Sequence, residues 1–152
     1  MRTIIVLLLA LSVVGPARAE PVNLRAVAVQ RLASGKLAAW ERQWYQQIAA
    51  GKPCASTTVW STQYGKWEGY NGTPYHLAAN PSHLPRGTVV YLEATGRLMV
   101  VTNRGASSND RIARRKGAAY WVDVHTRYCG EYGWTTRNTR LWVVGFDRGW
   151  AR

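Results

Sequence analysis

The sequence predicts a mainly β domain preceded by a helical segment. After Cys54, short runs of β-branched and aromatic residues are separated by Gly, Pro and Asn, which is typical of a β-barrel or a β-sandwich. From Val22 to Ala50 the chain is instead rich in Ala, Leu and Gln, with apolar residues at helical spacing. The 152 residues are enough for one domain with a hydrophobic core, but too few for two.

The first nineteen residues have the pattern of a cleavable export signal. Arg2 supplies a positive charge, Ile4–Val14 an apolar run, and Ala17–Ala19 a small-x-small cleavage site before Glu20. The alternative is a membrane anchor, but this apolar run is much shorter than the roughly 20 residues that cross a bilayer. We therefore expect a secreted or periplasmic protein without a transmembrane span after cleavage.

Residues 20–53 are expected to form an N-terminal helical segment. Apolar side chains recur there at steps of three and four residues, at Leu37, Trp40, Trp44 and Ile48. Gly51 and Pro53 then end the helix. Large aromatic residues at this spacing normally become buried, so the two tryptophans are expected to dock the helix on the domain.

Residues 54–152 are expected to form the β domain. The predicted strands are Thr57–Tyr64, Thr88–Glu93, Arg97–Thr102, Tyr120–Val124 and Leu141–Phe146. The connection Ala94–Gly96 is short enough to make the second and third of these an antiparallel hairpin. Two stretches, Gly65–Ser82 and the basic Gly105–Gly117, are expected to be irregular. The basic stretch is either a solvated loop or a specific anion site.

The charge balance narrows the possible partners. The chain has 20 Lys and Arg against 8 Asp and Glu, a formal net charge of +12. Loss of the export signal would remove Arg2 and Arg18 and leave about +10. Such a surface attracts anions, and outside the cytoplasm these are wall polymers, anionic lipids and acidic polysaccharides. Nucleic acid is not expected to be the partner.

The two cysteines are expected to form one disulfide, Cys54 to Cys129, because an exported chain folds in an oxidising compartment. The alternative is a metal site that combines a cysteine with His76, His83 or His125. No closely spaced pair of Cys or His supports that alternative, so neither a metal nor a cofactor is predicted.

Three sequence segments resemble a known superfamily. They are Ala79–Tyr91, with its Pro-Arg-Gly-Thr turn, Gly96–Gly105, and Trp121–Val124. Together they resemble the three-aspartate (3D) domain, the MltA-type lytic transglycosylases and the rare-lipoprotein-A-like domains. The resemblance implies a six-stranded double-psi β-barrel that acts, as a monomer, on peptidoglycan or another anionic wall polysaccharide.

The resemblance also implies where the site residues lie. The three carboxylates of the family would fall at Asn80, Asn103 and Asp123, so only Asp123 keeps an acid. A lytic transglycosylase closes an anhydro ring with the substrate's own hydroxyl, so one acid can serve as proton donor and then as base. Asp123 would be that acid, while Asn80, Asn103, Arg104 and Trp121 would hold the glycan.

Other interpretations of the same residues remain open. One is that the chain binds glycan without cutting it, because two family acids are missing. Another is that it acts as a basic effector on anionic membranes, although no basic amphipathic helix is expected. Asp123 is either the acid or the partner of Arg127 or Arg104 in an ion pair, which would lower its pKa. Should Asp123 not be the acid, Asp110 and Glu131 are the next candidates.

Overall fold

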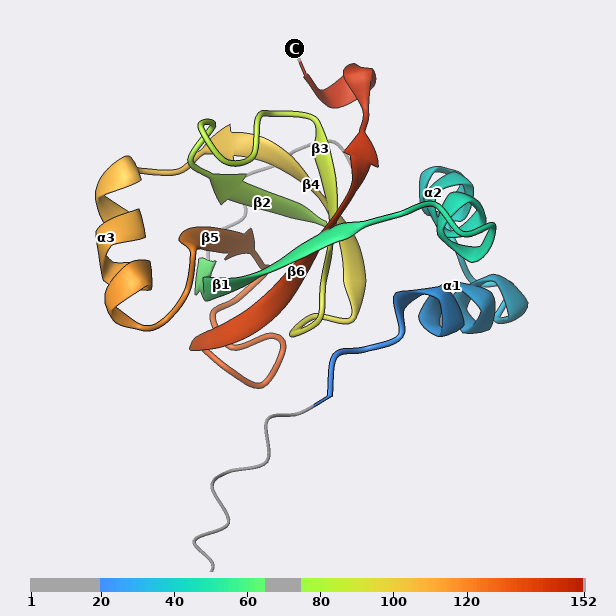
Figure 1. Cartoon of the computed structure of the whole chain (residues 1–152), viewed down its shortest axis with the longest axis horizontal. Coiled ribbons are helices and arrows are strands. Elements are labelled where there is room, and N and C mark those ends of the chain that lie inside the picture. The colour runs from blue at the N-terminus through green and yellow to red at the C-terminus, as the bar shows by residue number, and fades with distance from the viewer. Residues whose placement is uncertain (1–19, 65–74, 152) are drawn as a thin grey trace, which may run out of the picture.

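The computed structural model describes residues 20–64 and 75–151, which form a closed six-stranded β-barrel with helices on two sides (Figure 1). The chain is therefore mainly β, and of the two predicted architectures it adopts the barrel. The expected export signal, residues 1–19, lies outside the described residues. Within the described ranges, no helix is both long enough and apolar enough to cross a membrane.

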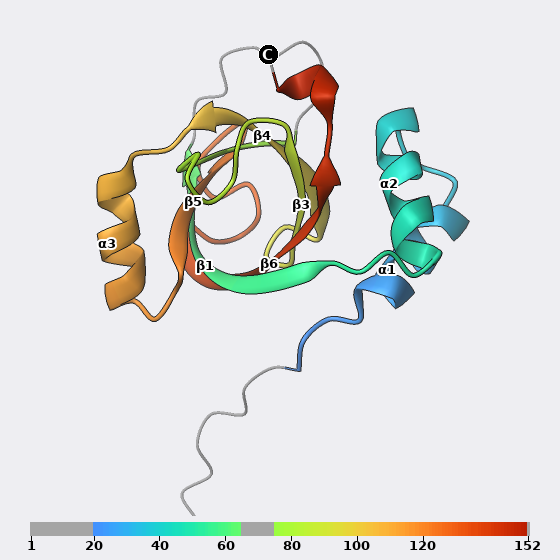
Figure 2. The same ribbon diagram turned by 45° about the horizontal axis from the view of Figure 1, so that its top comes forward.

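Six strands build the barrel, and they follow one another around it in the order β1-β5-β2-β4-β3-β6 (Figure 2). Their bounds are β1 Ala55–Tyr64, β2 His76–Ala79, β3 Thr88–Leu92, β4 Arg97–Arg104, β5 Tyr120–His125 and β6 Thr136–Phe146. The pairs β1–β5 and β2–β4 are parallel, and the other four pairs are antiparallel. The predicted hairpin is confirmed as β3–β4.

The core of the barrel consists of apolar side chains that point inward from every strand. Leu77, Met99, Val122 and Leu141 are among those that are completely buried there. Successive side chains on a strand point to opposite faces, so the residues between these lie on the outer wall of the barrel. That outer wall is covered by helices on two sides.

Two helices, α1 (Leu24–Ala33) and α2 (Ala39–Ala49), cover the outer wall formed by β3, β4 and β6 (Figure 1). Trp44 and Ile48 of α2 are buried against this wall. The contact depends on Gly145 of β6, because a Cβ atom there would lie 2.5 Å from the Trp44 ring. A larger residue at position 145 would therefore push the helix away from the barrel.

Two elements form where irregular chain was expected. Strand β2 lies in the stretch Gly65–Ser82, and all four of its residues are buried, so it has no polar–apolar alternation to reveal it. Helix α3 (Ser107–Arg115) replaces the expected basic loop, and it contains almost no apolar residues. It is held by hydrogen bonds of the buried Asp110 rather than by an apolar stripe.

The predicted Cys54–Cys129 disulfide is wrong, because both cysteines are free thiols. Cys54 directly precedes β1, where its Sγ approaches the Lys52 carbonyl. Cys129 lies near the other end of that strand, with its Sγ 3.8 Å from the Gln63 carbonyl. A disulfide needs Cα atoms less than about 7 Å apart. The strand, which rises about 3.3 Å per residue, keeps the two cysteines much farther apart than that.

Candidate functional site

Strand β5 places Asp123 on the outer wall of the barrel. The even-numbered side chains from Tyr120 to Val124 are buried in the core, and Trp121, Asp123 and His125 are half-buried on the other face. Trp121 and His125 therefore flank Asp123 along the strand, about 7 Å away on each side. Of these two neighbours, the sequence had indicated Trp121 as a site residue but not His125.

A hydrogen-bonded chain links the indole of Trp121 to the carboxyl group of Asp123. The two strands β1 and β5 are in register here, with Thr62 opposite Asp123. Trp121 Nε1 donates to Thr62 Oγ1 over 2.9 Å, and the Thr62 hydroxyl donates in turn to Asp123 Oδ1. Because the hydroxyl oxygen accepts the hydrogen bond from the indole N–H, its own proton is directed at the carboxylate, and one oxygen of Asp123 is fixed in place.

Burial shifts the titration of both ionisable groups on this face. Burial raises the pKa of Asp123 above its ordinary value, while the Thr62 hydrogen bond and the charge of His125 oppose that shift. Burial also lowers the pKa of His125, against the influence of Asp123. The carboxyl group thus keeps its proton to a higher pH than an exposed aspartate, and the imidazole tends to be neutral.

Asp123 and Trp121 line a small cavity of about 130 Å³. The other lining residues come from β2, from the end of β4 and from the start of α3: Ala78, Arg104, Gly105, Ala106 and Asn109. Gly105 is required because a Cβ atom there would lie 2.9 Å from the Ala79 carbonyl carbon. Arg104 and Trp121, both predicted to hold substrate, are therefore beside the predicted acid.

Asp123 forms neither of the ion pairs that the sequence had left open, with Arg127 or with Arg104. Arg127 instead binds Glu131, with Nη2 2.8 Å from Oε1, close to the surface. Within residues 20–64 and 75–151, no Lys or Arg side chain forms an ion pair with Asp123. The same contact occupies Glu131, which was one of the two reserve candidates for the acid.

Asn80 does not reach the cavity and instead supports the fold. Its Nδ2 donates to Asp110 Oδ2 over 2.7 Å, and its Oδ1 accepts from the backbone of Ser82. Asp110, the other reserve acid, also accepts from the Trp121 backbone and lies 3.3 Å from His83 Nε2. With three donors around a buried carboxylate, this cluster connects α3 to β5 and to the loop after β2. The imidazole of His83 also stacks on Tyr120.

Asn103 lies near the site but is not among the residues that line the cavity. In the sheet, Ala78 of β2 is paired with Asn103 of β4 on one side and with Asp123 of β5 on the other. The β2–β4 register shifts between Leu77 and Ala78, so β4 has a bulge at this point. Such a bulge re-aims side chains, which the sequence did not reveal.

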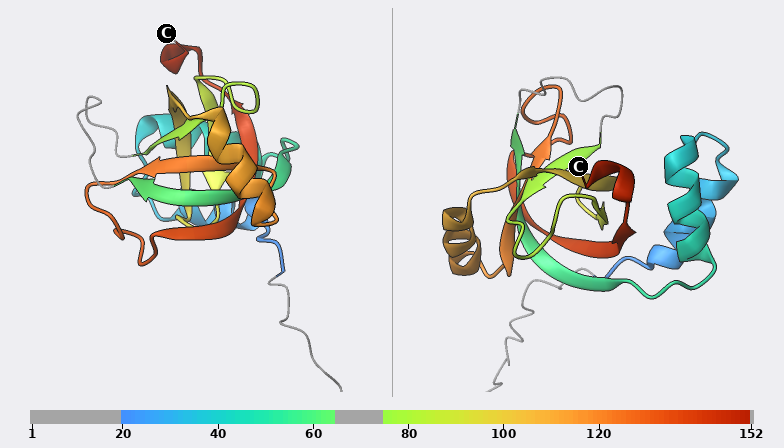
Figure 3. Two further views of the ribbon diagram at one scale, coloured as in Figure 1. Left: turned by 90° about the vertical axis from the view of Figure 1, so that its left-hand side faces the viewer. Right: turned by 90° about the horizontal axis from the view of Figure 1, so that it is seen from above.

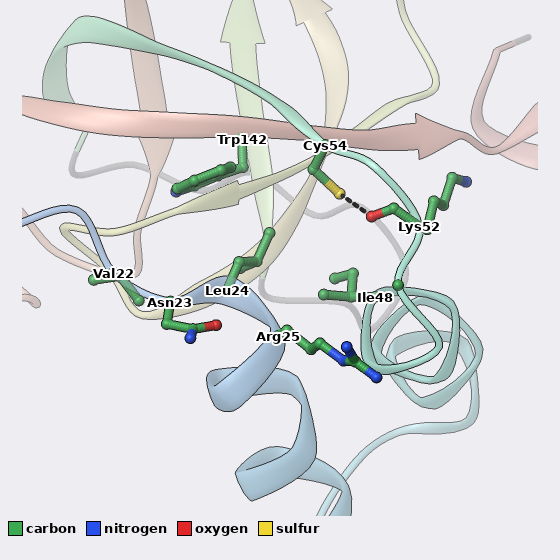
Figure 4. Close-up of a pocket in the computed structure, with 9 residues that line it drawn as sticks. Val22, Asn23, Leu24, Arg25, Ile48, Lys52, Cys54 and Trp142 are labelled. Carbon is green, nitrogen blue, oxygen red and sulfur yellow. Dashed lines mark hydrogen bonds between the residues drawn. The ribbon is translucent and has the colours of Figure 1, made fainter.

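A second and larger cavity, of about 410 Å³, lies between the helix pair and the barrel (Figure 4). Its polar side chains are already engaged: Arg25 Nε donates to the Ala49 carbonyl and Lys52 Nζ to Gln47 Oε1. Burial raises the pKa of the Cys54 thiol, which favours the unreactive protonated form. Among the described residues that line this space there is no pair of acid and base, so we place the candidate site at Asp123.

Comparisons of the chain with protein-family models, with curated proteins and with solved structures found no match. The similarity to the three-aspartate superfamily therefore rests on the sequence segments alone. Among residues 20–64 and 75–151, no three His, Cys, Asp or Glu side chains come together as a metal site requires.

Sequence reasoning missed Thr62, His125 and Asn109. His125 was detectable, because it follows Asp123 by two positions on a predicted strand. Thr62 became visible only through the parallel pairing of β1 with β5, which no local pattern encodes. Asn109 depends on the position of α3, a helix that the sequence did not predict.

Proposed function

We propose that the protein is an exported cell-wall protein that cleaves peptidoglycan glycan strands as a lytic transglycosylase, with Asp123 as its single acid. The observation that supports this most is the state of that carboxyl group. It is half-buried beside a cavity, free of any Lys or Arg ion pair among the described residues, and its pKa is raised. A proton donor that works near neutral pH needs these properties.

In the proposed reaction, protonated Asp123 donates its proton to the glycosidic oxygen as the bond from that oxygen to the anomeric carbon breaks. The 6-hydroxyl of the same sugar attacks the anomeric carbon, and the Asp123 carboxylate removes the hydroxyl proton. The products are an anhydro sugar and a new free hydroxyl, and Asp123 recovers its proton. No water is consumed, so a second carboxylate to activate water is not needed.

Neighbouring residues support each half of this cycle. Burial beside Trp121 favours the protonated acid before cleavage. The Thr62 hydroxyl favours the carboxylate that forms during cleavage and fixes one oxygen, which leaves Oδ2 for the substrate. Arg104 and Asn109, at the rim of the cavity, supply donors for carboxylate or acetamido groups.

The double-psi form of the barrel and the export of the protein belong to the same proposal. Two parallel strand pairs within one six-stranded barrel support that topology. The charge pattern of residues 1–19 supports secretion or periplasmic location. Peptidoglycan is the neutral-to-anionic polymer found in that compartment, and the positive charge of the chain favours it.

The test is digestion of purified sacculi by the protein, followed by mass spectrometry of the soluble products. We expect 1,6-anhydro sugars from the wild type and none from Asp123→Asn, whose fold is checked by circular dichroism. Glu131→Gln, which changes the acid of a separate ion pair, serves as the control and should remain active. Full activity of Asp123→Asn would disprove the role of this acid.

A second candidate function is glycan binding without cleavage. It is favoured by the size of the cavity, because about 130 Å³ is well below the roughly 300 Å³ at which ligand pockets usually begin. Such a site would accept one substituent of a sugar rather than a whole ring. Retention of the wild type on sacculi, with no anhydro products released, would support binding over catalysis.

A further inference from the structure

The outer wall of the barrel next to Asp123 has two features that extend past the reacting carboxyl group. One is a pair of half-buried tryptophans, Trp60 and Trp121, and the other is the basic end of α3. Figure 3 (left) shows α3 lying in front of β1 and β5, the strands that hold these tryptophans.

The cations of α3 are not neutralised by the protein. The helix buries Asp110 and Ala113 and exposes Arg111, Arg114 and Arg115. Two of these arginines lie in the last turn, where they complement the helix dipole. In the described part of the chain, none of the three forms an ion pair. Clustered like charges without partners attract an external anion.

Lys116 joins this basic end of α3 to the barrel wall. Its backbone carbonyl accepts a hydrogen bond from Asn138 Nδ2 of β6 over 2.7 Å. Its ammonium group lies 5.7 Å from the centre of the Trp60 ring. The end of the helix is therefore fixed beside an indole rather than extended into solvent.

The two tryptophans lead from Lys116 to Asp123. Trp60 of β1 is directly opposite Trp121 of β5, and Thr62 is opposite Asp123 one row farther along. The two rows are about 7 Å apart, because each residue of a strand adds about 3.3 Å. Val59 and Ser61 are completely buried, so Trp60 and Thr62 lie on the same outer face as the acid.

We propose that this face, defined by Trp60, Trp121, Lys116 and Arg115, is a docking surface for a glycan strand that carries carboxylates. The inference rests on the proposed function and extends the site beyond the cleaved bond. Indole faces stack on the apolar faces of sugar rings. The spacing of the rows fits one to two sugars between Asp123 and Lys116, and arginine and lysine then bind the carboxylate substituents.

The test measures binding apart from cleavage, by titration calorimetry of the full chain with Asp123→Asn as the common background. The probe is a muramic tetrasaccharide with free lactyl carboxylates, and the control ligand is its neutral methyl ester. At about 50 mM salt we expect the free acid to bind about five- to tenfold more tightly than the ester, since two exposed ion pairs supply such a factor.

Matched variants identify which cations cause the preference for the free acid. Arg115→Gln with Lys116→Gln should remove the preference for the free acid, whereas Lys36→Gln with Arg42→Gln should keep it. The second pair removes the same charges from the opposite side of the molecule, near α1 and α2 (Figure 1). Trp60→Ala should weaken both ligands equally, with unfolding excluded by circular dichroism.

Three outcomes overturn the docking surface. They are equal binding of acid and ester by the parent, equal losses in the two charge variants, and tighter binding of single-stranded DNA or polyphosphate than of the tetrasaccharide. Each of these leaves the sacculus digestion untouched, because that experiment measures the release of anhydro products by the wild type and its loss in Asp123→Asn. Conversely, the wild type could release no anhydro products while the parent still binds the free acid more tightly than the ester. That result would support the docking surface and disprove the catalytic proposal.

Discussion

Asp110 and Asp123 both lie next to Trp121, yet their surroundings differ in every respect that matters for function. Asp110 is buried and has three donors, from Asn80, His83 and the Trp121 backbone. Asp123 is half-buried, has the Thr62 hydroxyl as its donor and borders a cavity. A carboxylate that is held by donors on both of its oxygens keeps a structure together, whereas one with an oxygen directed at a cavity is available for chemistry.

The largest effect is expected from Asp110→Ala. Removal of this carboxylate leaves the Asn80 amide, the His83 imidazole and a backbone N–H without their partner. Breaking such a buried cluster costs about 3–5 kcal/mol of unfolding free energy, measured by urea denaturation. Glu131→Ala, which breaks an exposed ion pair, should cost at most about 1 kcal/mol. Similar losses for both variants would mean that the Asp110 cluster stabilises the fold no more than an exposed ion pair does.

Asn80→Ala tests whether Asn80 belongs to the fold or to the glycan site. The variant loses the donor to Asp110 and the turn contact to Ser82. We expect a loss of about 1–2 kcal/mol in unfolding free energy, with the release of anhydro products from sacculi unchanged in folded protein. Asn109→Ala, at the cavity, should show the reverse: lower activity and nearly unchanged stability. A stable but inactive Asn80→Ala variant would show that Asn80 belongs to the glycan site.

Thr62→Val tests whether the Thr62 hydroxyl lowers the pKa of Asp123. The two side chains have nearly the same shape, but valine neither donates to Asp123 nor accepts from the Trp121 indole. We expect a loss of about 1 kcal/mol and an activity profile moved to higher pH, because the hydrogen bond that lowers the pKa of Asp123 is gone. Thr58→Val, also half-buried on β1, is the control. An unchanged pH profile would mean that the hydroxyl does not act on the acid.

The smallest expected effect is a change in how the unfolding free energy depends on pH in Asp123→Asn. Burial raises the pKa of Asp123 in the folded state, so between its ordinary value and the raised value the folded state binds more protons than the unfolded chain. The contribution of Asp123 to stability therefore falls as the pH rises through that window. Compared with wild type, Asp123→Asn should gain stability from pH 4 to pH 7 in urea denaturation. A relative loss over that range would show that the charged form is the favoured one.

Local patterns in the sequence were sufficient for much of the barrel. Strands β1, β3, β4 and β5 were predicted within a few residues, because each alternates or is β-branched and is bounded by Gly or Pro. Strand β6 was predicted only in its second half, since its first residues are polar and exposed. Strand β2 and helix α3 had no periodic apolar pattern, and the Cys54–Cys129 pairing was inferred from compartment alone, without the distance along β1.

The sequence by itself determined strands β1, β3, β4 and β5, the positive charge, and the position of Asp123 on a strand with Trp121 on its face. These are properties of neighbouring residues, and neighbours are fixed by the covalent chain. The tertiary structure alone decided that Thr62 reaches Asp123, that Asn80 and Asp110 support the fold, and that Lys116 lies beside Trp60. Each of these contacts joins residues at least 30 positions apart, and barrel closure and the docking of α3 set them.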